Sequence, residues 1–188
     1  MNGSHRSSGD PMPVRSVTEI EGLLDQMEKQ AAPPSPGDLD LVSSAIAKLF
    51  DVQPDEVAVL ELHAPSKILK FVLPDKLRAV GSIPLTSSAA LAARTARERR
   101  SDVVNNFAQS RHASVFEGVP LGRGQGVSIQ KLISTPVLRD GEVLGVAQIS
   151  RKGETQQDCG PDFKASDLKT LQGLNDVLAR FLLLVRSA

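Results

Sequence analysis

Apolar residues recur at helical spacing close to both ends of the chain. Near the N-terminus they stand three, four and three residues apart, which predicts a helix from about Val17 to Lys29. The residues of this stripe are Val17, Ile20, Leu24 and Met27. Because the stripe is narrow and the other positions are mostly polar, it suits pairing with another helix better than burial in a wide core.

The other helical patterns have broader apolar faces. A stripe from Leu39 to Phe50 is wide enough to pack on a sheet, and a long helix from about Phe163 to Val185 carries apolar residues on more than one face. Part of that last helix therefore needs a partner. The stretch Ala31–Gly37 holds three prolines and is a linker, while residues 1–15 lack apolar periodicity and are expected to form a disordered tail.

Short apolar runs between these helices predict strands. The dipeptide Asp140-Gly141 lies between two such runs and is a strong signal for a β-hairpin. An alanine-rich helix reaching about Arg99 follows Thr86–Ser88, whose hydroxyl groups suit N-caps. An irregular segment, Asn105–Ser128, separates that helix from the hairpin. The predicted strands are Val57–His63, Ile68–Leu73, Ser82–Leu85, Ile129–Leu138 and Val143–Ile149.

The order of these elements indicates an α+β fold. Hairpins imply antiparallel strands, and helices at the two chain ends imply that one face of the sheet is covered by them. We therefore divide the chain into a tail (residues 1–15), an N-terminal helix with its proline-rich linker (16–37) and one folded domain (38–188).

Composition narrows the classes of function. Lys and Arg total 22 and Asp and Glu total 22, so the chain has no global attraction to nucleic acid or to an anionic membrane. The absence of Trp and Tyr disfavours stacking on single-stranded nucleic acid. The single cysteine, Cys159, excludes an intramolecular disulfide and a cysteine-rich zinc site, and no other cluster has metal-ligand spacing. No apolar run has membrane-spanning length, so we expect a cytoplasmic protein with neither membrane nor direct nucleic-acid partners.

Several stretches resemble the GAF domain family. One is the run Ser82–Ser88 before the alanine-rich helix, and another is the hairpin Ile133–Ile149, with the sequence ISTPVLRDGEVLGVAQI. Phe163 and Asp167 also match the start of the family's final helix. The resemblance covers about Leu39–Leu184. It implies a six-stranded antiparallel sheet with helices on one face, and on the other a pocket closed by the irregular segment.

The resemblance also implies a regulatory role. Members of the family bind cyclic nucleotides, bilins, haem or small metabolites, or only dimerise, and many regulate signalling enzymes or transcription factors. Arg151-Lys152 stands where cyclic-nucleotide-binding members often carry Asn-Lys, and we interpret a contact from Lys152 to Asp167 as a structural tie. Covalent bilin attachment lacks its cysteine, because Arg111 precedes His112.

The cysteine content argues against catalysis. A few members of the family are methionine sulfoxide reductases that run a relay between thiols. A lone Cys159, expected to be exposed in a polar loop, cannot close such a relay. We therefore predict that the chain is not an enzyme and has no catalytic residues.

Two hypotheses for function remain. The first is a pocket that senses a small anion without a bound cofactor, held by Ser87 and Ser88 at a helix start and by the guanidinium of Arg111. The residues expected to line this pocket are Phe71, Ser82, Phe107, Phe116, Ile129 and Ser134. The alternative is a purely structural dimerisation module with a vestigial pocket. In both, we expect a homodimer formed through the terminal helices and a signalling or transcription partner.

Overall fold

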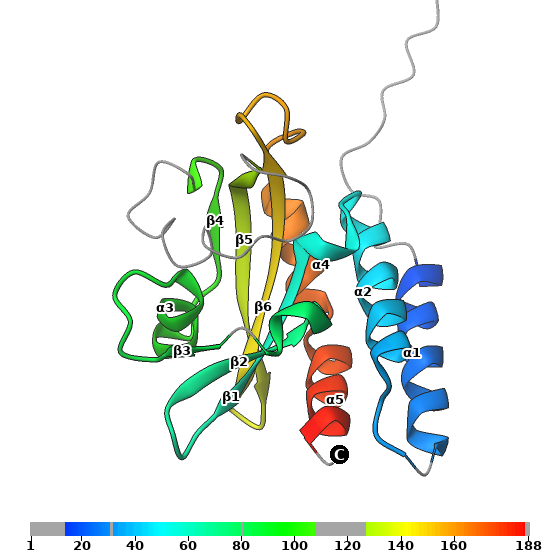
Figure 1. Ribbon diagram of the computed structural model, residues 1–188. Helices are drawn as coiled ribbons and strands as arrows, with labels where there is room; N and C mark the ends of the chain where they lie inside the picture. The colour runs from blue at the N-terminus through cyan, green and yellow to red at the C-terminus, as the bar shows by residue number, and fades with distance from the viewer. Residues whose placement is uncertain (1–13, 31, 80, 108–126, 187–188) are drawn as a thin grey trace, which may run out of the picture.

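The protein, described here by a computed structural model, is defined over residues 14–30, 32–79, 81–107 and 127–186. In these ranges the fold centres on a six-stranded sheet in the order β3-β2-β1-β6-β5-β4, with all neighbouring strands antiparallel (Figure 1). The α+β class and the six strands are as predicted. The strands are β1 (Val57–His63), β2 (Ile68–Leu73), β3 (Ser82–Pro84), β4 (Asp102–Val104), β5 (Ser128–Arg139) and β6 (Glu142–Gly153).

Helices cover the two faces of this sheet unequally. One face, called here the helical face, is covered by α2, α4 and α5, with α1 packed against α2 and α5; the short helix α3 packs on the opposite face, the α3 face (Figure 1). The terminal helices thus share one face, as predicted. The helices are α1 (Val14–Lys29), α2 (Pro36–Phe50), α3 (Leu91–Glu98), α4 (Ala165–Gly173) and α5 (Asn175–Arg186), with 3-10 turns η1 (Pro54–Glu56) and η2 (Asp75–Leu77). None of the helices in the described ranges combines the length and hydropathy needed to cross a bilayer.

The proline-rich linker leads into α2 through a pair of side-chain caps. Ser35 Oγ accepts a hydrogen bond from the Asp38 N–H at 3.2 Å, and Asp38 Oδ2 accepts one from the Ser35 N–H at 2.8 Å. These bonds satisfy N–H groups that the first helical turn leaves without an intrahelical partner. With its start fixed, α2 buries Leu39, Val42 and Ile46, each at most 1% exposed, against the sheet.

The β5–β6 hairpin is the longest pairing in the described sheet, with twelve residues in each strand. Its turn residues Asp140 and Gly141 have φ of 52° and 80°, the pair of positive values that a two-residue hairpin turn requires. The hairpin prediction is confirmed. Gly145 of β6 lets the strand pass close to β1, because a Cβ at this position would meet the Leu60 carbonyl oxygen at 2.1 Å.

The C-terminal helical region is broken, whereas one long helix from Phe163 was expected. Leu174 separates α4 from α5. The side chain of Asn175 explains the break, since its Oδ1 accepts from the Leu138 N–H at 2.7 Å and its Nδ2 donates to the Leu138 carbonyl at 2.9 Å. These two bonds anchor the end of β5 to the first residue of α5.

The N-terminal helix α1 begins at Val14, within the stretch 1–15 that was expected to be a tail. Its apolar stripe is buried by packing on α2 and α5 of the same chain. The buried stripe residues are Ile20, Leu24 and Met27, which are 1%, 0% and 4% exposed. The stripe that was expected to face a second copy is therefore occupied within the chain, and homodimerisation itself stays a prediction.

Charged side chains flank that stripe. Arg180 of α5 donates hydrogen bonds to Asp25 and Glu28 of α1 at 2.5–2.7 Å, and we call these three residues the Arg180 cluster. The hydrogen bonds from Arg180 hold the pKa of both carboxyl groups below their usual values. A second ion pair joins Lys48 of α2 to Glu19 of α1 at 2.9 Å. The two contacts define one register of α1 on the domain.

The substitution Gly145→Ala tests the close approach of β6 to β1. The added methyl group would meet the Leu60 oxygen at 2.1 Å and Leu182 Cδ1 at 2.8 Å, so overpacking should lower the free energy of unfolding by about 3 kcal/mol. Gly22→Ala in α1 is the matched control: nothing lies within 4 Å of its Cβ, and alanine should raise that free energy by about 1 kcal/mol. Urea denaturation measures both, and effects of the same sign would contradict this packing.

Candidate functional site

The α3 face of the sheet holds most of the described residues that the sequence analysis assigned to a pocket. Phe71 of β2 is 9% exposed and belongs to the same apolar cluster as Leu60 of β1 and Val146 of β6. Small side chains at and just before α3 let this helix lie close to the sheet. They are Ala90, Ala92, Ala93 and Ala96.

Three buried polar side chains lie between α3 and the sheet. Thr95 of α3 and Ser134 of β5 are both 0% exposed, and Gln148 of β6 is 2% exposed. The oxygen atoms Thr95 Oγ1 and Ser134 Oγ are 2.8 Å apart, and Gln148 Nε2 donates to Ser134 Oγ at 3.1 Å. We call these residues the buried polar triad. Burying such groups is costly unless they are hydrogen-bonded, which explains their mutual contacts.

The side chains of the triad are uncharged, and one of their hydrogen bonds can change direction. Ser134 Oγ accepts from Gln148, while either hydroxyl group can donate in the bond to Thr95. A hydroxyl carries one donor and two acceptor sites, so this bond can reverse its direction to suit a new neighbour. The triad can therefore offer a donor or an acceptor to a polar group that enters this face.

The sequence analysis found one member of the triad and missed two. Ser134 was predicted, whereas Gln148 and Thr95 were not. Gln148 is the cross-strand partner of Ser134, so the register set by the hairpin turn was the signal for it. Thr95 had no local signal, because its contact joins residues 39 positions apart in the chain.

The remaining pocket predictions have different surroundings. Phe107 is 1% exposed and packs with Leu91 and Leu132, and Ile129 is half-buried against this cluster. Ser82 lies exposed on the edge strand β3. Arg111 and Phe116 lie outside the described residues.

The expected helix start at Thr86–Ser88 is displaced. The helix α3 begins at Leu91, and Ser87 Oγ accepts a hydrogen bond from the Ala90 N–H at 3.1 Å. Arg97 further ties this loop to α3 by donating to the backbone carbonyls of Ser87 and Leu85. Ser87 is thus engaged by backbone and Ser88 is exposed, so the described contacts do not assemble both hydroxyl groups at a helix N-terminus.

Charged residues at the end of β6 have structural partners. Lys152 Nζ donates to the Asp55 carbonyl at 2.6 Å and lies 3.4 Å from the Asp55 carboxylate. The predicted tie from Lys152 to Asp167 is wrong, because Asp167 instead accepts the Lys164 N–H at 2.6 Å and caps α4. Arg151 stacks on the Phe163 ring, with its guanidinium carbon 4.8 Å from the ring centroid. These contacts tie the end of β6 to η1 and to the segment that precedes α4.

Cys159 is buried, although it was expected to be exposed. It is 8% exposed, and its Sγ lies 3.2 Å from the carbonyl oxygen of Gln156. Gly153 adjoins it so closely that a Cβ there would lie 3.0 Å from Cys159 Cβ. The thiol therefore packs inside the loop that precedes α4.

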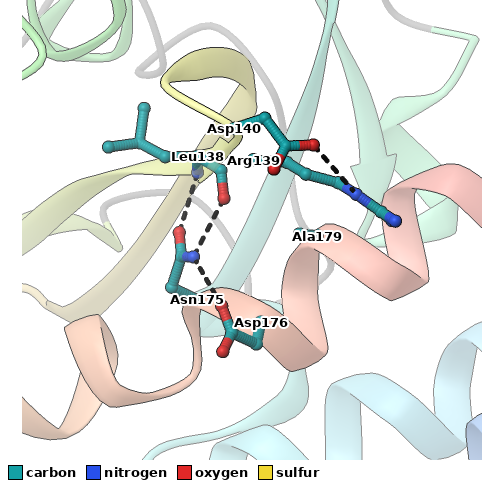
Figure 2. Close-up of a pocket in the computed structure, with 6 residues that line it drawn as sticks. All are labelled: Leu138, Arg139, Asp140, Asn175, Asp176 and Ala179. Carbon is teal, nitrogen blue, oxygen red and sulfur yellow. Dashed lines mark hydrogen bonds and ion pairs between the residues drawn. The ribbon is translucent and has the colours of Figure 1, made fainter.

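An open pocket of about 490 Å³ lies on the helical face, beside the β5–β6 turn and the start of α5 (Figure 2). Its lining residues are Leu138, Arg139, Asp140, Asn175, Asp176 and Ala179. Figure 2 shows the Asn175 amide directed at the backbone of Leu138, and its Nδ2 also donates to Asp176 at 3.0 Å. The amide of Asn175 is thus engaged in anchoring the hairpin, and we take the α3 face, with its buried polar triad, as the candidate site.

This fold can be compared with known families. Its features are an antiparallel sheet, the long β5–β6 hairpin and the short helix α3 on the face opposite the other helices. A family model described as "GAF domain" matches residues 37–182. The chain belongs to the GAF domain family. The match begins at the second residue of α2 and ends within α5, so α1 lies outside it. No curated protein matches the chain in sequence.

Solved structures share this GAF fold at low sequence identity. The GAF domain of an Acinetobacter phosphoenolpyruvate-protein phosphotransferase is 15% identical, with a TM-score of 0.59, over 89% of this chain and 95% of that chain. A methyl-accepting chemotaxis protein is 16% identical, with a TM-score of 0.57, over 86% and 96%. Free methionine-R-sulfoxide reductase from Neisseria meningitidis is 15% identical, with a TM-score of 0.57, over 100% and 99%.

The reductase corrects one expectation. The sequence analysis predicted that the chain is not an enzyme, but an enzyme shares its fold over the full length. This shared fold contradicts the prediction of no enzymatic activity. It does not by itself assign the chemistry of the reductase to this chain, because a fold does not determine the chemistry of the sites built on it.

Removing the shared hydroxyl tests whether the triad is bonded as described. Ser134→Ala leaves Thr95 Oγ1 and Gln148 Nε2 without this buried partner, which should lower the free energy of unfolding by about 1–3 kcal/mol. Ser166→Ala is the control, because Ser166 is an exposed residue of α4 and its replacement should change the free energy of unfolding by no more than about 0.5 kcal/mol. Chemical denaturation gives both values, and an unchanged stability for Ser134→Ala would contradict the network.

Proposed function

We propose that the chain is a regulatory domain that senses a small ligand on its α3 face and passes this signal to a signalling or transcription partner. GAF domains are generally regulatory sensing domains of signalling proteins. The observation that carries the proposal is the buried polar triad in an otherwise apolar face. Small-molecule sites combine apolar walls with a few converging polar groups, and the α3 face has this composition.

A ligand at the triad would act on α3 through Thr95. The bond between Thr95 and Ser134 is a direct polar link from α3 to the sheet. A ligand group that bonds Ser134 in place of Thr95 would favour a different position of the helix. A ligand shifts a conformational equilibrium by its difference in affinity for the two states. Binding of a ligand to this face would therefore move α3.

We infer further that the ligand is a small anion. Arg94 adjoins Thr95 in the chain and donates to Asp102 at 3.1 Å, and Asp102 is the strand partner of Ser134. Arg111, from the predicted pocket, would add a second guanidinium. A guanidinium forms short, charge-assisted bonds with carboxylate or phosphate, which favours an anionic ligand.

A thermal-shift screen tests the sensing proposal. The panel contains inorganic phosphate, a cyclic nucleotide, a small dicarboxylate, haem and a neutral amino acid. A ligand present at 100 times its dissociation constant should stabilise the native chain by about 2.7 kcal/mol and raise its melting temperature. We expect an anion to do so. A response to neutral ligands alone would contradict the inference that the ligand is an anion.

Calorimetric titration of the responding anion then tests individual residues. Arg111→Ala should weaken binding about tenfold or more, because a hydrogen bond to a charged group is lost. Arg139→Ala is the control, since Arg139 is an exposed residue of the β5–β6 turn on the helical face. Equal affinities for the wild type and Arg111→Ala would remove Arg111 from the site.

Homodimerisation is a second candidate function, favoured by apolar side chains that remain on the helical face. Leu41 of α2 is 53% exposed, and Leu184 and Val185 of α5 are only half-buried. Exposed apolar surface of this kind is commonly covered by a partner. A second copy of the chain is the partner that we propose.

A further inference from the structure

A buried N–H group between α3 and β4 has no hydrogen-bond acceptor within the described part of the chain. It is the Nε–H of Arg94 on α3. Removing such a group from water is destabilising unless it finds an acceptor. The Arg94 side chain is nevertheless 28% exposed, so a small solute can approach its guanidinium from the solvent. This N–H group is therefore suited to donate to an oxygen atom of a ligand.

The neighbouring nitrogen of the same guanidinium is held by a single bond. Arg94 Nη2 donates to Asp102 Oδ2 of β4 at 3.1 Å. Nε and Nη2 lie on one edge of the planar guanidinium, and a carboxylate or phosphate fits that edge with two parallel hydrogen bonds. Asp102 makes the bond to Nη2 and leaves Nε without an acceptor. An incoming oxyanion that takes both positions would make one bond more than Asp102 makes.

Asp102 keeps a second cation beside it when it leaves Arg94. Its Oδ1 lies 3.5 Å from Arg100 Nη2, and the Arg100 side chain is 60% exposed and free to follow it. Arg100 also lies 3.3 Å from Glu98. Release of Asp102 from Arg94 therefore does not leave its carboxylate without a neighbouring positive charge.

The Arg94–Asp102 pair adjoins the buried polar triad. Asp102 is the strand partner of Ser134, and Ser134 is the strand partner of Gln148, so the three side chains form a row across β4, β5 and β6. Residues directly opposite one another on neighbouring strands have Cβ atoms about 5 Å apart. A small ligand can therefore reach Arg94 with a charged group and Ser134 with an uncharged polar group.

We propose that Arg94 anchors the anionic group of the ligand, which replaces Asp102 on the Nε–Nη2 edge of the guanidinium. The occupant is a small carboxylic acid or phosphate ester that also carries a hydroxyl group for Ser134. This inference rests on the sensing function proposed above. It adds the residue that binds the charge and the internal carboxylate that competes with the ligand. Because Arg94 lies on α3 and Asp102 on β4, binding would also break the ion pair that joins these elements.

The Nε–Hε resonance of Arg94 in the full wild-type chain reports the new bond directly by nuclear magnetic resonance. The probes are β-hydroxybutanoate and glycerol phosphate, which distinguish a carboxylate from a phosphate ligand, and glycerol is the neutral control. We expect at least one of the two anions to shift this resonance until it saturates, whereas glycerol should not. If neither anion shifts it, the anchor is wrong.

Two variants distinguish an anchor from an ion pair that only supports the fold. Arg94→Gln removes the guanidinium and should weaken binding of the responding anion about tenfold or more. Asp102→Asn keeps the shape of the side chain and removes the competing charge, so it should tighten binding about threefold or more. If the ion pair only holds α3 on β4, both substitutions loosen the same contact and should change the affinity in the same direction.

Arg99→Gln is the matched control, because it removes the same charge from an exposed residue at the end of α3. It should change the affinity by no more than about twofold, since exposed charges act weakly at a distance in salt. Circular dichroism of each variant checks that it is folded. If Arg94→Gln does not fold, the wild-type titration and Asp102→Asn still decide the question.

The outcomes separate this inference from the sensing function. Binding to Asp102→Asn that is equal to or weaker than binding to the wild type would overturn the replacement of Asp102. A ligand from the thermal-shift panel that stabilises the chain without shifting the Arg94 resonance would also overturn the anchor, while the sensing function would stand. If no ligand stabilises the chain and neither probe binds, both proposals are wrong.

Discussion

The described structure depends on the β5–β6 hairpin, because neither of its long strands is at an edge of the sheet and both of their faces must be covered. The positive φ angles of Asp140 and Gly141 make the tight turn, and the missing side chain of Gly145 lets β6 lie against β1. From this pair the sheet extends by β1, β2 and β3 on one side and by β4 on the other. One layer of helices covers the helical face of this sheet, and a separate layer that includes α3 covers the opposite face.

The two layers differ in a way that assigns them different roles. On the helical face, the helices bury large side chains such as Leu39, Ile46 and Phe181 against the sheet. The α3 face is covered in part by an eight-residue helix with small side chains and contains the buried polar triad. Dense apolar packing suits a rigid platform and an interface between helices, whereas a short helix over polar groups suits a site that adapts to a ligand.

Local patterns in the sequence predicted the elements of the fold well, and contacts between distant residues were predicted poorly. The turn at Asp140-Gly141 and the helical stripes have short-range signals, so they were found. The bond from Lys152 to Asp55 and the contact between Thr95 and Ser134 join distant segments, so no local pattern revealed them. The α1 stripe looks the same whether it pairs within one chain or between two, because both arrangements bury the same side chains.

Native-state hydrogen exchange of the free chain tests the division of roles most directly. If the α3 face adapts to ligands and the hairpin is the platform, the amides of Thr95 and Ala96 in α3 should exchange through a local opening. The free energy of that opening should lie well below the value for Val146 and Ala147 in β6, which should approach the free energy of global unfolding. Equal protection in α3 and β6, with both opening only on global unfolding, would contradict an adaptable α3 face.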